Sequence, residues 1–166
     1  LNEFDVLYIG WTAYASNEGM QALYDRSSHI GEFLENGGGL VAFSEYGDNE
    51  LDWLWLPFDI QYWTQHGETI EIVDHYHPVN NGLTSSHLSF WYSSLHNTFL
   101  EYTEFLSPIT TEGSSGDAVT LVGDYNGLNG RIVLSGQDAD WHFVYNYGPK
   151  GDAAGLLIAN ALDWVG

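Results

Sequence analysis

The sequence contains no cysteine, and this absence excludes several kinds of chemistry. A disulfide framework, a thiolate metal site and a cysteine nucleophile all require a thiol, so none of them can be built from this chain. Long apolar runs are lacking too, since no stretch approaches the roughly 18 residues of a membrane-spanning helix. We therefore expect no membrane insertion.

Basic residues are almost absent. Arg26, Arg131 and Lys150 stand against 23 acidic residues, which gives a formal net charge of -20. Neutralising phosphates requires Lys and Arg, so we expect no nucleic-acid partner. Calcium or another divalent cation, high salt or a basic partner surface would relieve the self-repulsion of such a chain.

The residues that are abundant indicate a folded protein with its own core. The chain has 166 residues, of which 44% are hydrophobic and 16% aromatic, so we expect residues 1–166 to form a single domain. Plentiful Trp, Tyr, Gly, Ser and Asn beside scarce lysine favour an extracellular or cell-surface location. The cytoplasm of a salt-adapted organism is the alternative explanation of the acidity.

The most informative stretch runs from a helix end through a glycine corner into a buried strand. Ile30, Phe33 and Leu34 share one helical face, and Asn36-Gly37 can close that helix. The apolar residues 40–43 then read as a strand covered on both faces. Ligands of α/β folds sit beyond the carboxyl ends of the strands, so the turn at 44–46 should border any site.

Other stretches carry the signal of one element each. We expect further strands at residues 4–10, 69–74, near 105, 118–123 and 130–135, the last two forming a hairpin. We expect helices from near 18 to 34, capped by Ser16 or Asn17 and broken at 26–28. We also expect a short helix and loop at 48–63, and a last helix that Asp152 caps. Turn-rich or polar loops are expected at 77–83 and 110–117.

Four stretches in this order resemble the class I glutamine amidotransferase-like fold, and within it the ThuA-like proteins. The stretches are residues 4–10, 37–43, 77–83 and 129–136. The resemblance implies a flavodoxin-like three-layer α/β sandwich, with a mostly parallel central sheet and a C-terminal β-hairpin and helix. The strand-helix unit that normally opens such domains is missing, so we expect a fragment of a larger chain.

The resemblance also implies where the chemistry should lie. Amidotransferases place a cysteine after the central strand, where Ser44 stands here, and a His-Glu pair after a late strand, where residues 137–140 stand. Both functional groups are absent. Our leading hypothesis is therefore a non-catalytic interaction or structural module of a larger secreted or surface protein, partnered by other domains of that protein or forming a homo-oligomer.

The alternative hypothesis is a ThuA-like carbohydrate-active enzyme or sugar-binding domain with a pocket at the carboxyl ends of the strands. Ser44 would be the nucleophile, with Glu45 and His142 assisting it, because a serine needs a base within hydrogen-bond reach. The candidate ligand-binding residues are Trp11, Tyr46, His77, Gln137 and Asp138. In the plainer reading, Ser44 only stabilises its turn.

Two short segments have the residue types of a metal site. In an extended conformation, Asp138, Asp140 and His142 would point to one side and could hold calcium or a transition metal. His75 and His77 form a similar zinc-like pair. The alternatives are that Asp138 caps backbone amides and that His77 belongs to a structural turn.

A group of aromatic residues exceeds what one small core usually needs. Such rings could stack on sugars, form an apolar interface or cover the ends of the sheet. The group is Trp53, Trp55, Tyr62, Trp63, Phe90, Trp91 and Tyr92.

Overall fold

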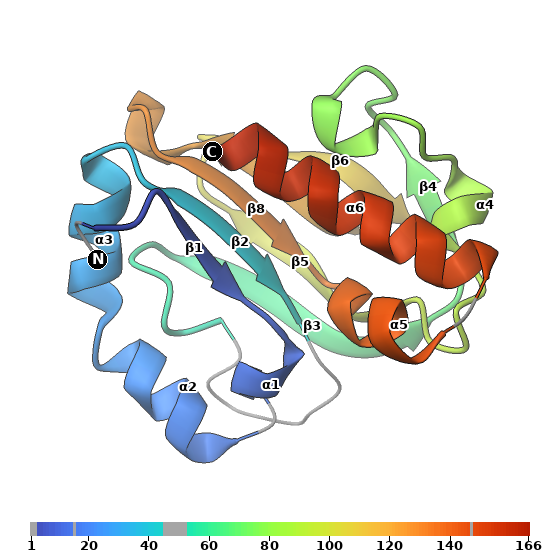
Figure 1. Ribbon diagram of the computed structural model, residues 1–166, viewed down its shortest axis with the longest axis horizontal. Coiled ribbons are helices and arrows are strands. Elements are labelled where there is room, and N and C mark those ends of the chain that lie inside the picture. The colour runs from blue at the N-terminus through green and yellow to red at the C-terminus, as the bar shows by residue number, and fades with distance from the viewer. Residues whose placement is uncertain (1–2, 15, 45–52, 147) are drawn as a thin grey trace.

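The computed structural model describes residues 3–14, 16–44, 53–146 and 148–166, and it is built on one eight-stranded sheet (Figure 1). The main path of the sheet runs β1-β2-β8-β7-β5-β3, and β6 joins β4 to β7. The strands are β1 (Val6–Ile9), β2 (Gly39–Phe43), β3 (Ile60–Gly67), β4 (Ile70–Ile72), β5 (Leu95–Tyr102), β6 (Leu106–Glu112), β7 (Ala118–Asp124) and β8 (Arg131–Ser135).

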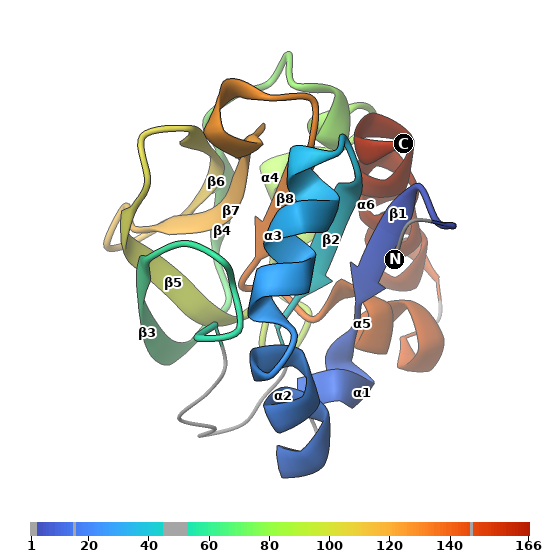
Figure 2. The ribbon, with the colours of Figure 1, turned by 90° about the vertical axis from the view of Figure 1, so that its left-hand side faces the viewer.

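Helices lie on both faces of the parallel strands (Figure 2). The α-helices are α1 (Trp11–Tyr14), α2 (Asn17–Tyr24), α3 (Ser27–Glu35), α4 (Ser85–Leu88), α5 (Ala139–Tyr145) and α6 (Pro149–Val165). Two short 3-10 turns, η1 (Pro78–Asn80) and η2 (Tyr125–Gly127), complete the described elements. In the described part of the chain, no helix combines the length and the apolar character needed to cross a membrane.

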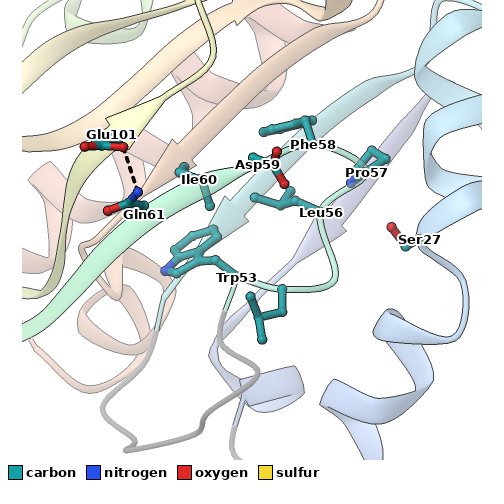
Figure 3. A pocket seen from close by; sticks show the side chains of 10 residues that line it. Ser27, Trp53, Leu56, Pro57, Phe58, Asp59, Ile60, Gln61 and Glu101 are labelled. Atoms are coloured by element: carbon teal, nitrogen blue, oxygen red, sulfur yellow. Dashed lines mark hydrogen bonds between the residues drawn. The ribbon is translucent and has the colours of Figure 1, made fainter.

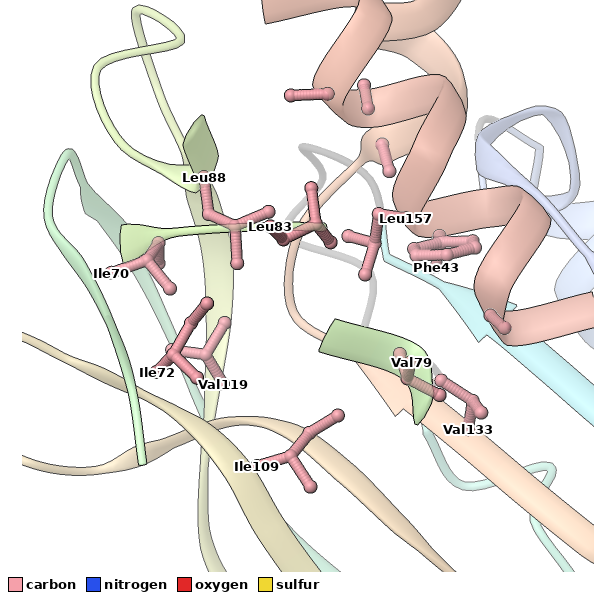
Figure 4. Close-up of a cluster of buried hydrophobic side chains, with 14 of the residues drawn as sticks. Phe43, Ile70, Ile72, Val79, Leu83, Leu88, Ile109, Val119, Val133 and Leu157 are labelled. Carbon is pink, nitrogen blue, oxygen red and sulfur yellow. The ribbon is translucent and has the colours of Figure 1, made fainter. Parts of the chain in front are cut away.

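The alternation of β2 divides the interior into two clusters. Val41 and Phe43 pack with α6 residues such as Leu157, whereas Leu40 and Ala42 pack in the cluster that contains Phe33 of α3. Figure 4 shows Phe43 beside Leu157 in the first cluster. Burial on both sides of a continuous apolar strand is what a central position between two helical layers requires. The predicted α/β class and three-layer sandwich are confirmed.

Parallel pairing is confined to one half of the sheet. β1, β2 and β8 are parallel, whereas β7 pairs antiparallel with β8, β5 and β6, and the pairs β3–β5 and β4–β6 are antiparallel as well. The parallel part is therefore smaller than we expected from the resemblance. The predicted hairpin is present as β7–β8, and the last helix follows it.

Most expected elements are present, and a few boundaries were wrong. Ser16 caps α2 through a 2.9 Å hydrogen bond from the Gly19 amide, as predicted. The predicted break between the two helices is present, but it lies at residues 25–26 rather than 26–28, because α3 already begins at Ser27. Residues 60–63, expected in a helix and loop, begin β3, and β5 was not predicted. Gly148, not Asp152, occupies the N-cap of α6.

Candidate functional site

The carboxyl ends of β1, β2 and β8 bring several predicted site residues to one edge of the sheet. Trp11 follows β1, Ser44 follows β2, and Gln137 and Asp138 follow β8. Parallel neighbours end at the same edge, so this meeting follows directly from the register of the three strands. Glu45 and Tyr46, which were also predicted here, lie outside the described residues.

Ser44 continues the pairing of β2 with β8. Its amide donates a 2.9 Å hydrogen bond to the Ser135 carbonyl oxygen, and the residue is fully buried. Within the described ranges its hydroxyl has no hydrogen-bond partner. The described imidazoles therefore do not supply the base that a serine nucleophile needs.

Asp138 holds a buried carboxylate between two imidazoles. Its Oδ2 lies 3.2 Å from His96 Nε2 and its Oδ1 lies 3.1 Å from His142 Nε2. All three residues are at least 95% buried. His142 reaches the carboxylate because α5 places residues four apart on one face. His96 comes from β5 and was missed, because no strand was predicted there.

Both ring nitrogens of His142 have polar neighbours, and its ring packs against two tryptophans. Its Nε2 lies 3.2 Å from the Ser93 carbonyl oxygen, and its Nδ1 contacts the side-chain amide of Asn146. A proton on Nε2 can be donated to the Ser93 carbonyl oxygen or directed toward Asp138 Oδ1. The ring also lies 5.0 Å, centroid to centroid, from Trp91 and from Trp141.

These contacts determine the charge of Asp138. Burial alone would raise the pKa of its carboxyl group, but hydrogen bonds from His142 and His96 and their charge outweigh burial and hold the pKa below the ordinary value. The carboxylate is thus ionised at neutral pH.

Gln137 links the end of β8 to α4. Its side chain is fully buried, and its Nε2 donates to the Leu88 carbonyl oxygen at 3.2 Å. The Gln137 amide donates to the Ser135 hydroxyl at 3.2 Å. These bonds assign Gln137 a structural position at the predicted edge.

Asp140 turns away from Asp138, so the predicted extended arrangement of residues 138–142 is wrong. Residues 139–145 are helical, and Asp140 Oδ2 instead accepts a 2.8 Å hydrogen bond from the Trp11 amide. Burial is the main cause that raises the pKa of Asp140, and burial together with this carboxylate raises the pKa of Tyr8. Among the described residues, no three His, Asp or Glu side chains are arranged to hold a metal ion.

His75 and His77 are not brought to this edge. They lie in a turn rather than an extended segment, and His77 Nδ1 accepts from the Val79 amide at 3.3 Å. The His77 ring packs 4.8 Å from that of Trp164, and Trp164 precedes Val165, which lies against Gly39 at the start of β2. His77 thus lies near the amino end of the parallel strands, and burial lowers its pKa against the effect of Asp74.

The aromatic group is divided between core and surface. Trp53, Trp55 and Trp91 are fully buried, and Tyr62 is half-buried. The exposed members are Trp63, Phe90 and Tyr92, with exposed fractions of 61%, 57% and 91%.

One pocket lies away from Asp138. It has a volume of about 630 Å³ and opens between residues 53–58, the start of β3 and the first residue of α3 (Figure 3). Trp53, Leu56 and Phe58 supply apolar lining, and Asp59 and Glu101 supply carboxylates. Sequence reasoning missed this pocket because its residues were assigned to a covering loop.

No family model matches the chain, and no curated protein matches it either. Among solved structures, the exo-beta-1,4-mannosidase Op5Man5 from Opitutaceae bacterium strain TAV5 is similar with a TM-score of 0.48 and 10% identity, over 98% of this chain and 25% of that chain. The chain thus spans about a quarter of the length of that enzyme.

Proposed function

We propose that this chain is a non-catalytic, amidotransferase-like module that acts in interaction or assembly within a larger secreted or surface protein. One observation carries the proposal. Among the described residues, the hydroxyl of fully buried Ser44 makes no hydrogen bond to an imidazole. The candidate base His142 instead contacts Asp138, Ser93 and Asn146. A general base must lie within about 3.2 Å of the proton that it abstracts.

An exposed aromatic loop supports the interaction role. Phe90 and Tyr92 have φ angles of 62° and 80°, and such strain in bulky residues persists only where the surroundings enforce it. Buried Trp91 between them supplies the anchor, because its Nε1 donates to the His87 carbonyl oxygen at 2.8 Å. Aromatic side chains held outward by a buried anchor suit an interface.

The partner that fits best is another domain of the same protein. A second copy of the chain would bring a further net charge of -20 into contact, and this repulsion disfavours self-association. The Lys150 ammonium lies 5.4 Å from the centre of the Tyr92 ring. One of the three basic residues of the chain is therefore located beside the aromatic loop of Phe90 and Tyr92.

The interaction role can be tested in the full-length natural protein with the double variant Phe90→Ser/Tyr92→Ser. We expect cross-linking between this domain and its neighbour to fall at least about tenfold, because aromatic anchors carry most of an interface's energy. The matched control is Tyr76→Ser, which removes a side chain that is 98% exposed at another place. Unchanged cross-linking in the double variant would contradict the proposed interface.

The non-catalytic role needs its own test. We expect Ser44→Ala to leave any hydrolysis of amide or glycoside substrates at the wild-type rate, measured with the folded protein at neutral pH. A loss of turnover by about 100-fold or more in Ser44→Ala would show a working nucleophile and overturn the proposal.

Sugar binding is the second candidate, and one ring cluster favours it. Trp11, Tyr145 and Trp141 lie at the carboxyl edge, with ring centroids 6.4 Å apart for Trp11–Tyr145 and 5.0 Å for Trp141–Tyr145. Asp140 lies beside them through its bond to the Trp11 amide. Calorimetric titration with neutral oligosaccharides tests this candidate, and we expect Trp11→Ala, but not Trp63→Ala, to abolish any heat of binding.

A further inference from the structure

The pocket of about 630 Å³ has the size of a site for a small organic molecule, since such sites measure about 300–1,000 Å³. Its apolar lining comes from the segment 53–58 and from Ile60 at the start of β3. Leu54 is 51% exposed, and Pro57 and Phe58 are half-buried, so part of this apolar lining faces water. Covering it with the apolar part of a ligand would lower the free energy.

Two carboxylates belong to the same cavity. A second pocket, of about 200 Å³, adjoins the first, and the two share Asp59 and Glu101 together with Gln61. Gln61 Nε2 donates to Glu101 Oε2 at 2.6 Å, which positions that carboxylate. Figure 3 shows Gln61 and Glu101 on the left of the lining and Ser27 on the right, with Asp59 between them. The two pockets thus combine an apolar wall with two carboxylates.

The described chain places no basic side chain beside these carboxylates. In the described ranges, neither pocket is lined by a lysine or an arginine. Each of the three basic residues of the chain contacts another group instead. These contacts are Arg26 with the Ala22 carbonyl oxygen, Arg131 with the Trp164 carbonyl oxygen, and Lys150 with the Tyr92 ring. A cationic ligand would therefore supply the counter-charge that Asp59 and Glu101 do not receive from a basic residue.

We infer that the two pockets bind a small primary amine that carries an apolar group. The ammonium group donates hydrogen bonds to the carboxylates of Asp59 and Glu101, and the apolar group covers Leu54 and Phe58. The net charge of -20 attracts such a cation and repels an anion of the same shape. This ligand class goes beyond the proposed function, and the loop of Phe90 and Tyr92 lines neither pocket.

The probe for the test is 2-phenylethylamine, a cation at neutral pH, titrated into the natural protein at about 0.15 M NaCl. Saturation-transfer NMR detects its bound ring protons, and we expect a saturable response with a Kd in the millimolar range. 2-Phenylethanol has the same apolar body without the charge and should bind at least about fivefold more weakly. A response that does not saturate, or equal binding of the alcohol, would overturn the inference.

The double variant Asp59→Asn/Glu101→Gln tests the place of the ammonium group. We expect its Kd for 2-phenylethylamine to rise by about 5- to 10-fold, as the loss of two exposed ion pairs predicts. The matched control Glu32→Gln/Asp163→Asn removes two exposed charges elsewhere and should change Kd by less than about twofold. An equal loss in both double variants would show general charge attraction and overturn the site.

A second pair of variants tests the place of the apolar group. Leu54→Ser removes an exposed part of the lining, and we expect Kd for 2-phenylethylamine to rise by about threefold or more. Leu128→Ser is the matched control, because Leu128 is 47% exposed and lines neither pocket. Equal Kd values for the two variants would contradict the assignment.

The failure of this inference can be distinguished from that of the proposed function. If 2-phenylethylamine does not bind but Phe90→Ser/Tyr92→Ser still disrupts cross-linking, the inference fails alone. Saturable binding that the double variant Asp59→Asn/Glu101→Gln weakens would support the site even if cross-linking were unchanged.

Discussion

At the scale of single residues, Asp138 carries an ionised group into the interior of an already acidic molecule. A buried carboxylate is tolerated only when donors compensate for its lost hydration. The imidazoles of His96 from β5 and His142 from α5 lie 3.2 and 3.1 Å from its two oxygens, so the carboxylate links these two elements.

We predict that Asp138→Asn destabilises the protein by about 3 kcal/mol, because the two imidazoles lose the buried charge that they face. Urea unfolding followed by tryptophan fluorescence measures the change. Asp163→Asn, on the exposed side of α6, is the control and should stay within about 0.5 kcal/mol of wild type. A destabilisation of Asp138→Asn no larger than that of the control would contradict the buried network.

The pH dependence of Asp138 follows from the direction of its shift. Its folded pKa lies below the ordinary 3.8, so its stabilising contribution is fully present above that value and is lost as the pH falls through the folded pKa. We predict a shallower loss of stability below pH 3.8 in Asp138→Asn than in wild type. Unfolding free energies measured from neutral pH downward decide this, and parallel curves would contradict it.

Asp140 should behave in the opposite way. Burial raises its folded pKa, so ionisation disfavours the folded state, and its contribution is present below the ordinary pKa and lost as the pH rises through the folded one. We predict that Asp140→Asn is better tolerated at pH 7 than at acid pH. The measurement is the difference in unfolding free energy between Asp140→Asn and wild type, at pH 7 and at acid pH. A difference that does not change with pH would contradict the prediction.

At the scale of elements, the N-termini of α2 and α3 differ. The Ser16 hydroxyl accepts from the Gly19 amide, whereas Arg26 at the start of α3 makes no side-chain cap. We predict that Ser16→Ala costs about 1 kcal/mol of stability in thermal unfolding. Ser28→Ala, an exposed change inside α3, is the control and should be neutral.

Some elements of the fold could be predicted from local sequence patterns, and others could not. The apolar run of β2 and the cap of α2 were predicted correctly, because their signals are local. β5 was missed because it carries His96, Asn97 and Thr98 into the core. These polar groups resemble a loop in sequence, and only pairing with distant residues satisfies them, as Asn97 does through Trp53 at 3.2 Å.

The candidate site was predicted in position but not in arrangement. Ser44 and Asp138 lie at the expected edge, since the order of strand and turn is readable locally. The partners of Asp138 depend on α5 being helical, which places His142 rather than Asp140 beside it. Over only five residues, such as 138–142, the two-residue repeat of a strand cannot be distinguished from the 3.6-residue repeat of a helix.

At the scale of the whole molecule, the large negative net charge affects the stability of the folded state. A net charge of -20 repels itself in the folded state, and salt screens that repulsion. We predict that NaCl raises Tm, by about 2–4 °C for each kcal/mol of repulsion removed. Thermal melts in NaCl and CaCl₂ at equal ionic strength separate screening from specific calcium binding, and a Tm that does not change in NaCl would refute the screening argument.

The place of β8 in the sheet has a consequence for synthesis. Although β8 is the last of the described strands, it lies between β2 and β7, parallel to β2 and antiparallel to β7. During synthesis, β2 can pair with β8 only after about 90 further residues have been made. The two halves of the sheet therefore cannot join before residues 131–135 leave the ribosome. Nascent chains stalled before residue 131 should remain sensitive to protease, and chains that expose β8 and α6 should become resistant.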